Sequence, residues 1–80
     1  MQAEIKLFSH LKYRFGIENL VVDVQNRITA LELKLKINKI GGSRISEIPF
    51  RIAVNGRFVE DDYIIQGEDE LALIPPVQGG

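Results

Sequence analysis

Alternation of hydrophobic and polar residues predicts a strand near the start of the chain. Residues 4–9 place Ile5 and Leu7 on one face and Lys6 and Phe8 on the other. Successive side chains of a strand point to opposite faces of a sheet, so this pattern is typical of a half-buried strand. We therefore expect Phe8 to lie on the solvent side of the sheet.

Further segments show the same kind of signal. Residues 19–25 are rich in β-branched side chains, which favour strands, and their apolar positions share one face: Leu20, Val22 and Val24. Residues 71–74 form a last apolar run that ends at Pro75 and Pro76. The short segment 11–15 between the first two strands is compatible with either a turn or a single helical turn.

Residues 28–40 carry two conflicting patterns. The apolar side chains at 31, 33, 35 and 37 alternate with charged ones, as in a strand. Thr29 followed by Glu32 forms a capping-box pattern, and Gly41-Gly42 is typical of a helix C-terminus. Leucine and isoleucine pairs four residues apart, and an expected Glu32–Lys36 ion pair, also favour a helix. We predict a helix.

A β-hairpin is predicted around Asn55-Gly56, since both central positions of a type I′ turn need positive φ. Its strands would be residues 50–54 and 57–59. Two strands, one main helix and further strands indicate an α+β domain with a mixed sheet and the helix packed on one face. This order is the outline of a β-grasp.

Composition narrows the functional classes. The 80 residues allow one domain, which we place at 1–76, with a flexible tail at 77–80. A net charge of −1 argues against nucleic-acid binding, and no apolar run is long enough to span a membrane. The chain has no cysteine and one histidine, His10, so no metal site is expected. We expect a cytoplasmic protein.

The C-terminal segment carries the main candidate for chemistry. Pro75 and Pro76 favour an extended exit from the last strand, while Gly79 and Gly80 form a thread without side chains beyond Gln78. Such a thread fits a narrow channel. Its reactive group is the carboxylate of Gly80, which accepts a sulfur nucleophile only after activation, for example as an acyl-adenylate.

The last twelve residues resemble the C-terminal signature of the molybdopterin synthase small subunit, a ubiquitin-like sulfur carrier, and residues 53–56 are similar to that family's hairpin. The resemblance implies a β-grasp fold and no catalysis by the chain alone. An ATP-dependent adenylyltransferase of the ubiquitin-activating type would activate Gly80, and a sulfur donor would convert it to a thiocarboxylate. The large synthase subunit would then pass the sulfur to cyclic pyranopterin monophosphate. No cofactor is expected on the chain itself; ATP is used by the activating enzyme.

The same resemblance assigns partner contacts and leaves alternatives open. Phe8, Phe58 and Ile74 match apolar contact positions of the family and would form an exposed patch beside the tail of Pro75, Pro76, Val77, Gln78, Gly79 and Gly80. Any of the three contact residues could instead belong to the core. We interpret the acidic groups at 61–62 and 68–70 as solvated turns or, alternatively, as charges that steer docking onto a basic partner surface. A carrier for thiamine, tRNA thiolation or cysteine synthesis, or a protein modifier conjugated through Gly80, remains an alternative.

Overall fold

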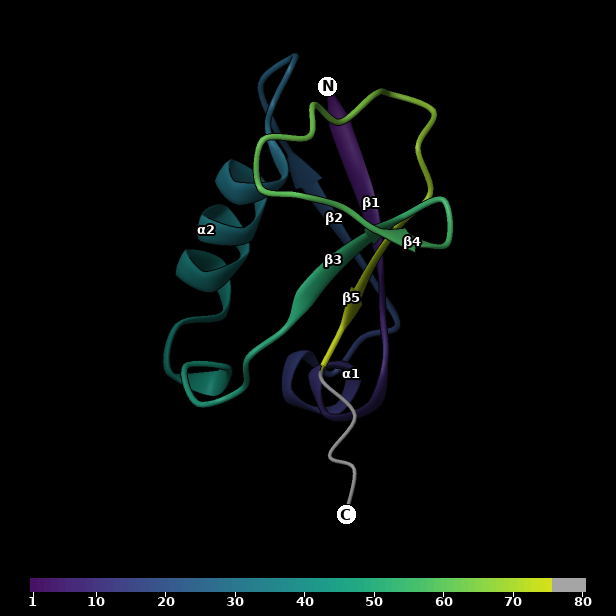
Figure 1. The fold of residues 1–80 in the computed structure, drawn as a ribbon. Helices are drawn as coiled ribbons and strands as arrows, with labels where there is room; N and C mark the ends of the chain where they lie inside the picture. The colour runs from purple at the N-terminus through teal and green to yellow at the C-terminus, as the bar shows by residue number, and fades with distance from the viewer. Residues whose placement is uncertain (76–80) are drawn as a thin grey trace.

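The computed structural model describes residues 1–75. It contains a five-stranded sheet, two α-helices and a short 3₁₀ helix (Figure 1). The elements in chain order are β1 Gln2–Leu7, α1 Ser9–Phe15, β2 Asn19–Asp23, α2 Ala30–Gly41, the 3₁₀ helix Gly42–Arg44, β3 Arg51–Val54, β4 Arg57–Phe58 and β5 Leu71–Ile74.

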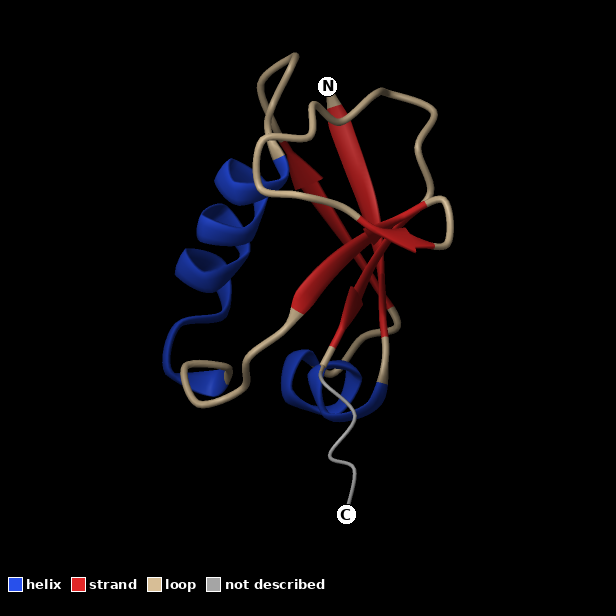
Figure 2. Ribbon diagram, in the orientation of Figure 1, coloured by secondary structure: helices blue, strands red, loops and turns tan. Residues whose placement is uncertain are grey.

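The sheet is mixed, with the strand order β2-β1-β5-β3-β4. The first and last strands, β1 and β5, are parallel neighbours at its centre, while the other pairs are antiparallel. Helix α2 covers one face of the sheet, and α1 lies at the end where β5 finishes (Figure 2). The predicted α+β arrangement, with one main helix on one face, is confirmed.

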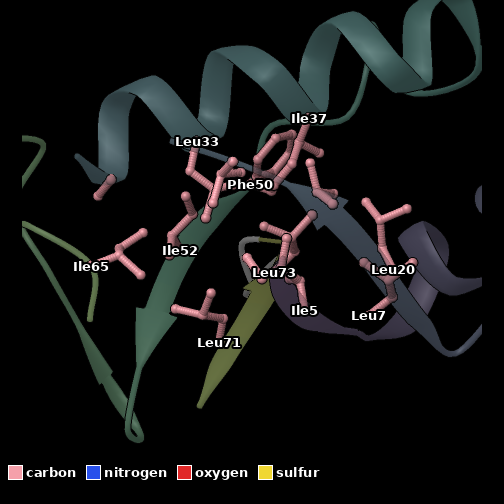
Figure 3. Close-up of a cluster of buried hydrophobic side chains, with 14 of the residues drawn as sticks. Ile5, Leu7, Leu20, Leu33, Ile37, Phe50, Ile52, Ile65, Leu71 and Leu73 are labelled. Atoms are coloured by element: carbon pink, nitrogen blue, oxygen red, sulfur yellow. The ribbon is translucent and has the colours of Figure 1, made fainter. Parts of the chain in front are cut away.

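The core lies between α2 and the covered face of the sheet. Figure 3 shows Leu33 and Ile37 of α2 pointing toward the side chains of the strands. The most deeply buried side chains come from both helices, the sheet and the segment after α2: Ile5, Leu11, Leu33, Ile37, Ile45 and Leu73. Burying an aliphatic side chain of this size contributes roughly 1.5–3 kcal/mol, so this layer dominates the stability of the domain.

Helix α2 begins as the sequence predicts. The backbone N–H of Glu32 donates to the Thr29 hydroxyl at 3.1 Å, and the backbone N–H of Thr29 donates to the Glu32 carboxylate at 3.0 Å. The loop before β5 supplies acceptors for the next free N–H groups, because Ala30 donates to the carbonyl of Tyr63 at 2.9 Å and Leu31 to that of Asp61 at 3.0 Å. The helix ends at Gly41, and its C-cap Gly42 has a φ of 54°.

One expectation for α2 was wrong in detail. Glu32 and Lys36 form no ion pair in the described part of the chain: the carboxylate of Glu32 is held by Thr29 and Gln25, and Lys36 donates to the carbonyl of Asp23 at 2.6 Å. Because the segment is helical, its alternating apolar residues lie on two different faces of the helix. Leu33 is buried with Ile37, but Leu31 and Leu35 are exposed.

The first strand runs over Gln2–Leu7 rather than over residues 4–9. It stops because Phe8 becomes the extended N-cap of α1 and Ser9 adopts a φ of 55°, which turns the chain out of the sheet. The segment left open between turn and helical turn is the seven-residue helix α1. Strand β2 ends at Asp23, two residues earlier than predicted.

The hairpin forms at the predicted turn. Asn55 and Gly56 both have positive φ, 51° and 82°, as a type I′ turn requires. Its strands are shorter than the predicted 50–54 and 57–59, since β3 starts at Arg51 and β4 ends at Phe58. Phe50 nevertheless lies in the core, because it precedes the strand on the covered side.

Candidate partner-binding face and the exit of the last strand

Strand β5 leads the chain out of the centre of the sheet. It is bound on one side by β1 and on the other by β3, so its direction is set by two neighbours. Ile74 and Pro75, which follow its buried Leu73, are half-buried. The remaining predicted tail residues, Pro76, Val77, Gln78, Gly79 and Gly80, lie outside the described residues, and their predicted role stays a prediction.

The face of the sheet opposite α2 has a continuous row of side chains across four strands. Lys6 of β1 is the register partner of Ala72 in β5, Ala72 is the partner of Ala53 in β3, and Ala53 is the partner of Phe58 in β4. Register partners point to the same face of a sheet. The row therefore has two small residues at its centre and larger ones at both ends.

An aromatic ring lies at each end of this row, and each ring is beside a cation: Phe8 is next to Lys6, and Phe58 is itself the last member of the row. The Lys6 ammonium nitrogen lies 5.4 Å from the ring centroid of Phe8, and the guanidinium carbon of Arg51 lies 4.2 Å from that of Phe58. Both distances are in the range of cation–π attraction. Phe8 is 40% exposed and Phe58 is 50% exposed, so each ring keeps a solvent-facing part.

A shallow groove of about 550 Å³ runs over the small residues. Ala72 and Ile74 of β5 line it together with Ala53 of β3, and Lys6 and Phe8 close one side. Of the three predicted contact residues, Phe8 and Ile74 therefore lie on one groove, and Phe58 stands beside it as the partner of Ala53. We name the surface formed by Lys6, Phe8, Ala53, Phe58, Ala72 and Ile74, together with Arg51, the open face.

Charges around the groove are mixed. Glu4 and Glu70 line it as well as Lys6. An apolar floor between aromatic rings, with charges at the rim, has the composition of a protein-binding surface, whose fully buried centre is depleted of charge. The residues at positions 1–75 contain no cluster of three His, Cys, Asp or Glu side chains placed to hold a metal ion. Nor does any helix within that range have the length and apolar character to cross a membrane.

The position of the hairpin relative to β5 also depends on the acidic turn at residues 68–70, which the sequence analysis interpreted as a solvated turn or as charges that steer docking. The backbone N–H of Asn55 donates to the carbonyl of Glu70 at 2.8 Å, and the backbone N–H of Glu70 donates to the Asn55 side-chain oxygen at 2.9 Å. The Asp69 carboxylate accepts from the Tyr63 hydroxyl at 3.1 Å and from the Gln66 backbone at 2.7 Å. These bonds fix the start of β5.

Tyr63 is held in its neutral form by this environment. Partial burial raises the pKa of its phenol above the ordinary value of 10.0, and the hydrogen bond to the Asp69 carboxylate raises the pKa further. The phenol, which is neutral at pH 7, donates its hydrogen bond to the Asp69 carboxylate.

Sequence reasoning missed Lys6, Arg51, Ala53 and Ala72 as members of the open face. The hairpin register was available in the sequence and would have placed Ala53 opposite Phe58. The parallel pairing of β1 with β5, which brings Lys6 beside Ala72, was not available, because it joins segments more than sixty residues apart.

The strand order, the single covering helix and the central exit of β5 define a ubiquitin-like β-grasp domain. Two solved structures share the fold over nearly the whole chain. The small archaeal modifier protein 1 from Haloferax volcanii is 26% identical, with all of both chains covered and a TM-score of 0.82. A putative molybdopterin converting factor, subunit 1, from Pyrococcus furiosus is 22% identical, with 96% of this chain and 99% of that chain covered and a TM-score of 0.83.

Sequence comparison gives the family. The model of the ThiS family matches residues 5–80. A molybdopterin synthase sulfur carrier subunit from Dictyostelium discoideum is 31% identical over 99% of this chain and 96% of its own length. One from Arabidopsis thaliana is 29% identical over all of this chain and 84% of its own length. The chain belongs to the ThiS family, and it is similar over its whole length to sulfur carrier subunits of molybdopterin synthase.

Proposed function

We propose that the chain is the sulfur-donating subunit of a molybdopterin synthase and that it carries the sulfur as a thiocarboxylate on Gly80. The observation that carries this proposal is the family match, which extends through residue 80 and therefore includes the Gly79-Gly80 end. The named relatives are sulfur carrier subunits of molybdopterin synthase, and they match over 84% and 96% of their own lengths.

The chemistry needs activation because a carboxylate is a poor electrophile. An adenylyltransferase joins the Gly80 carboxylate to AMP from ATP and releases pyrophosphate. A sulfide-level sulfur donor then attacks the acyl carbon, the C–O bond to AMP breaks, and AMP leaves with the electron pair. One carboxylate oxygen is thereby replaced by sulfur. No oxidation state changes in these steps when the donor supplies reduced sulfur.

Within this proposal, the chain positions and presents the sulfur, and catalysis belongs to its partners. The open face would bind the large synthase subunit, with Phe8, Phe58 and Ile74 as apolar contacts. Strand β5 would direct the following residues toward that subunit's active site, because the groove and the exit of β5 share Ile74. The bound large subunit would transfer the sulfur to cyclic pyranopterin monophosphate.

The test is mass spectrometry of the intact chain after incubation with a matched adenylyltransferase, ATP and a reduced sulfur source. The expected product is heavier by the replacement of one oxygen by sulfur, and fragmentation assigns the change to Gly80. A chain lacking Gly80 is the matched control and should remain unmodified. Failure of the full chain to gain sulfur with every adenylyltransferase of its source would contradict the proposal.

A second candidate function is supported by one observation. The archaeal modifier protein from Haloferax volcanii is 26% identical and matches this chain from end to end. We infer that the same activated Gly80 could be transferred to lysine amines of target proteins, forming isopeptide bonds with release of AMP. Branched Gly-Gly-lysine peptides in digests of cells that express the chain would support this function, and their loss without Gly80 is the control.

A further inference from the structure

Within residues 1–75, the outer edge of β2 presents backbone groups that do not pair with β1, in a known register. Val24 donates to the carbonyl of Met1 at 2.8 Å, and the Met1 amine donates back to Val24 at 2.8 Å. At the other end, Leu7 donates to the carbonyl of Glu18 at 2.9 Å. Hydrogen-bonded and non-hydrogen-bonded pairs alternate along an antiparallel ladder. Even-numbered residues of β2 therefore bond to β1, and Asn19, Val21 and Asp23 direct their N–H and C=O groups outward.

This edge is complementary to itself. We propose that β2 pairs in antiparallel register with β2 of a second copy, about a two-fold axis that passes between the two Val21 residues. Asn19 of each copy then lies opposite Asp23 of the other, and the three pairs each exchange two hydrogen bonds. The side chains are also complementary in this register, because the Asn19 amide of one copy can donate to the facing Asp23 carboxylate of the other. A two-fold interface of this kind uses the same surface on both subunits.

Lys36 does not block the pairing. Its ammonium group donates to the Asp23 carbonyl at 2.6 Å, but a carbonyl oxygen has two lone pairs and can accept a second hydrogen bond from Asn19 of the other copy. The hydrogen bond from Lys36 to Asp23 also shows that the side of α2 that carries Lys36 lies next to the edge of β2. Ile40 lies four residues further along the same side of the helix and is 42% exposed.

Apolar side chains therefore lie on both sides of the strand edge. Val21 is 54% exposed on the open side of the sheet, and Ile40 is on the helix side. In the proposed dimer, each Val21 packs against the other. Proline, lysine and bulges commonly protect sheet edges, and residues 19–23 contain none of these. The opposite edge, β4, has only two residues and is much less suited to pairing.

The dimer goes beyond the proposed sulfur-carrier function and is compatible with it. Edge pairing adds strands in the plane of the sheet, so the groove over Ala53 and Ala72 remains uncovered. A net charge of −1 per chain produces little repulsion between two copies. The ladder is short, and we therefore expect a reversible dimer with a dissociation constant in the micromolar to millimolar range.

Sedimentation equilibrium of the full chain tests the proposal. The weight-average mass should rise from the 9.0 kDa monomer toward twice that value as the concentration increases. Val21→Lys should raise the dissociation constant by about tenfold or more, because two like charges then face each other across the axis. A synthetic chain with N-methylated Val21 loses one outward N–H per copy without losing a bond to β1, and it should dissociate similarly.

Leu35→Lys is the matched control, since Leu35 is 59% exposed but lies on the outer face of α2. It should leave the dissociation constant unchanged, and circular dichroism should show all three variants folded. A chain that stays monomeric at millimolar concentration would overturn the proposal. So would a dimer that Leu35→Lys dissociates while Val21→Lys and the N-methylated chain leave it intact.

Discussion

The side-chain amide of Asn55 donates to the carboxylate of Asp69 at 3.0 Å. This bond joins the turn of the β3–β4 hairpin to the loop that begins β5, and the same carboxylate also binds Tyr63 and Gln66. The hairpin carries Phe58, and β5 carries Ala72 and Ile74. This asparagine–aspartate contact, at the other end of the sheet from the exit of β5, therefore reinforces the β3–β5 pairing that sets the spacing of the open face.

Replacing Asn55 separates the effect of its backbone conformation from that of its hydrogen bonds. Asn55→Gly keeps the positive φ but removes both side-chain bonds, to Asp69 and to Glu70, and should lower the free energy of unfolding by about 1–2 kcal/mol. Asn55→Ala should cost about 1 kcal/mol more, because a side chain at positive φ is strained. Urea unfolding of the two variants measures the difference. Equal stabilities would show that turn strain contributes nothing.

Gly41 is predicted to resist replacement by alanine despite its helical position. A Cβ atom at residue 41 would overlap two side-chain atoms of buried Ile45 and lie 3.1 Å from the ring of Phe15. Crowding of this kind costs about 1–3 kcal/mol, which outweighs a helix-propensity gain of about 1 kcal/mol. Gly67→Ala is the control, since a Cβ there meets nothing within 4 Å. Thermal unfolding should show a lower midpoint for Gly41→Ala only.

The capping box predicts a pH dependence at the start of α2. Hydrogen bonds from the Thr29 backbone and hydroxyl hold the pKa of Glu32 below its ordinary value of 4.5. The folded state thus favours the carboxylate, and this stabilisation is present above pH 4.5 and lost as the pH falls through the lowered pKa. Glu32→Gln should have a smaller loss of thermal stability on acidification than the parent.

The matched control for this titration is Glu47→Gln, which changes an exposed glutamate that makes no side-chain hydrogen bond within residues 1–75. Its acid profile should follow that of the parent chain. If Glu32→Gln and Glu47→Gln gave the same profile, the capping carboxylate would not be the group that titrates.

A substitution on the open face is expected to weaken partner binding without lowering the stability of the domain. Phe58 is half exposed and contacts the Arg51 cation rather than the core, so Phe58→Ala should leave the unfolding midpoint nearly unchanged. If the proposed function is correct, the same change should weaken binding of the large synthase subunit by about tenfold or more, as for aromatic residues central to interfaces. Leu35→Ala, on the exposed face of α2, should not affect binding. Isothermal titration calorimetry compares the variants.

Local signals in the sequence predicted the elements whose causes are local. Thr29 with Glu32 identified the start of α2, and Asn55-Gly56 identified the hairpin, because a cap and a type I′ turn are each determined by a few adjacent residues. Residues 71–74 were assigned correctly for the same reason: prolines follow them directly.

Interactions between distant segments were the ones that sequence reasoning missed. Lys36 could pair with Glu32 by spacing alone, but the folded chain brings the Asp23 carbonyl within its reach. From the sequence, Asp69 was interpreted as part of a solvated turn or as a docking charge. In the folded chain its carboxylate accepts hydrogen bonds from Asn55 and Tyr63. Phe8 was predicted on the right side of the sheet but inside a strand, because the turn at Ser9 depends on a positive φ that no glycine signalled.

The pairing of β1 with β5 has a consequence for synthesis on the ribosome. Strands β1 and β3 are joined only through β5, so the middle of the sheet is missing until residues 71–74 have left the exit tunnel. The nascent chain cannot complete its core stepwise, and folding waits for the final segment. A truncated product that lacks β5 would expose the edges of two central strands, β1 and β3.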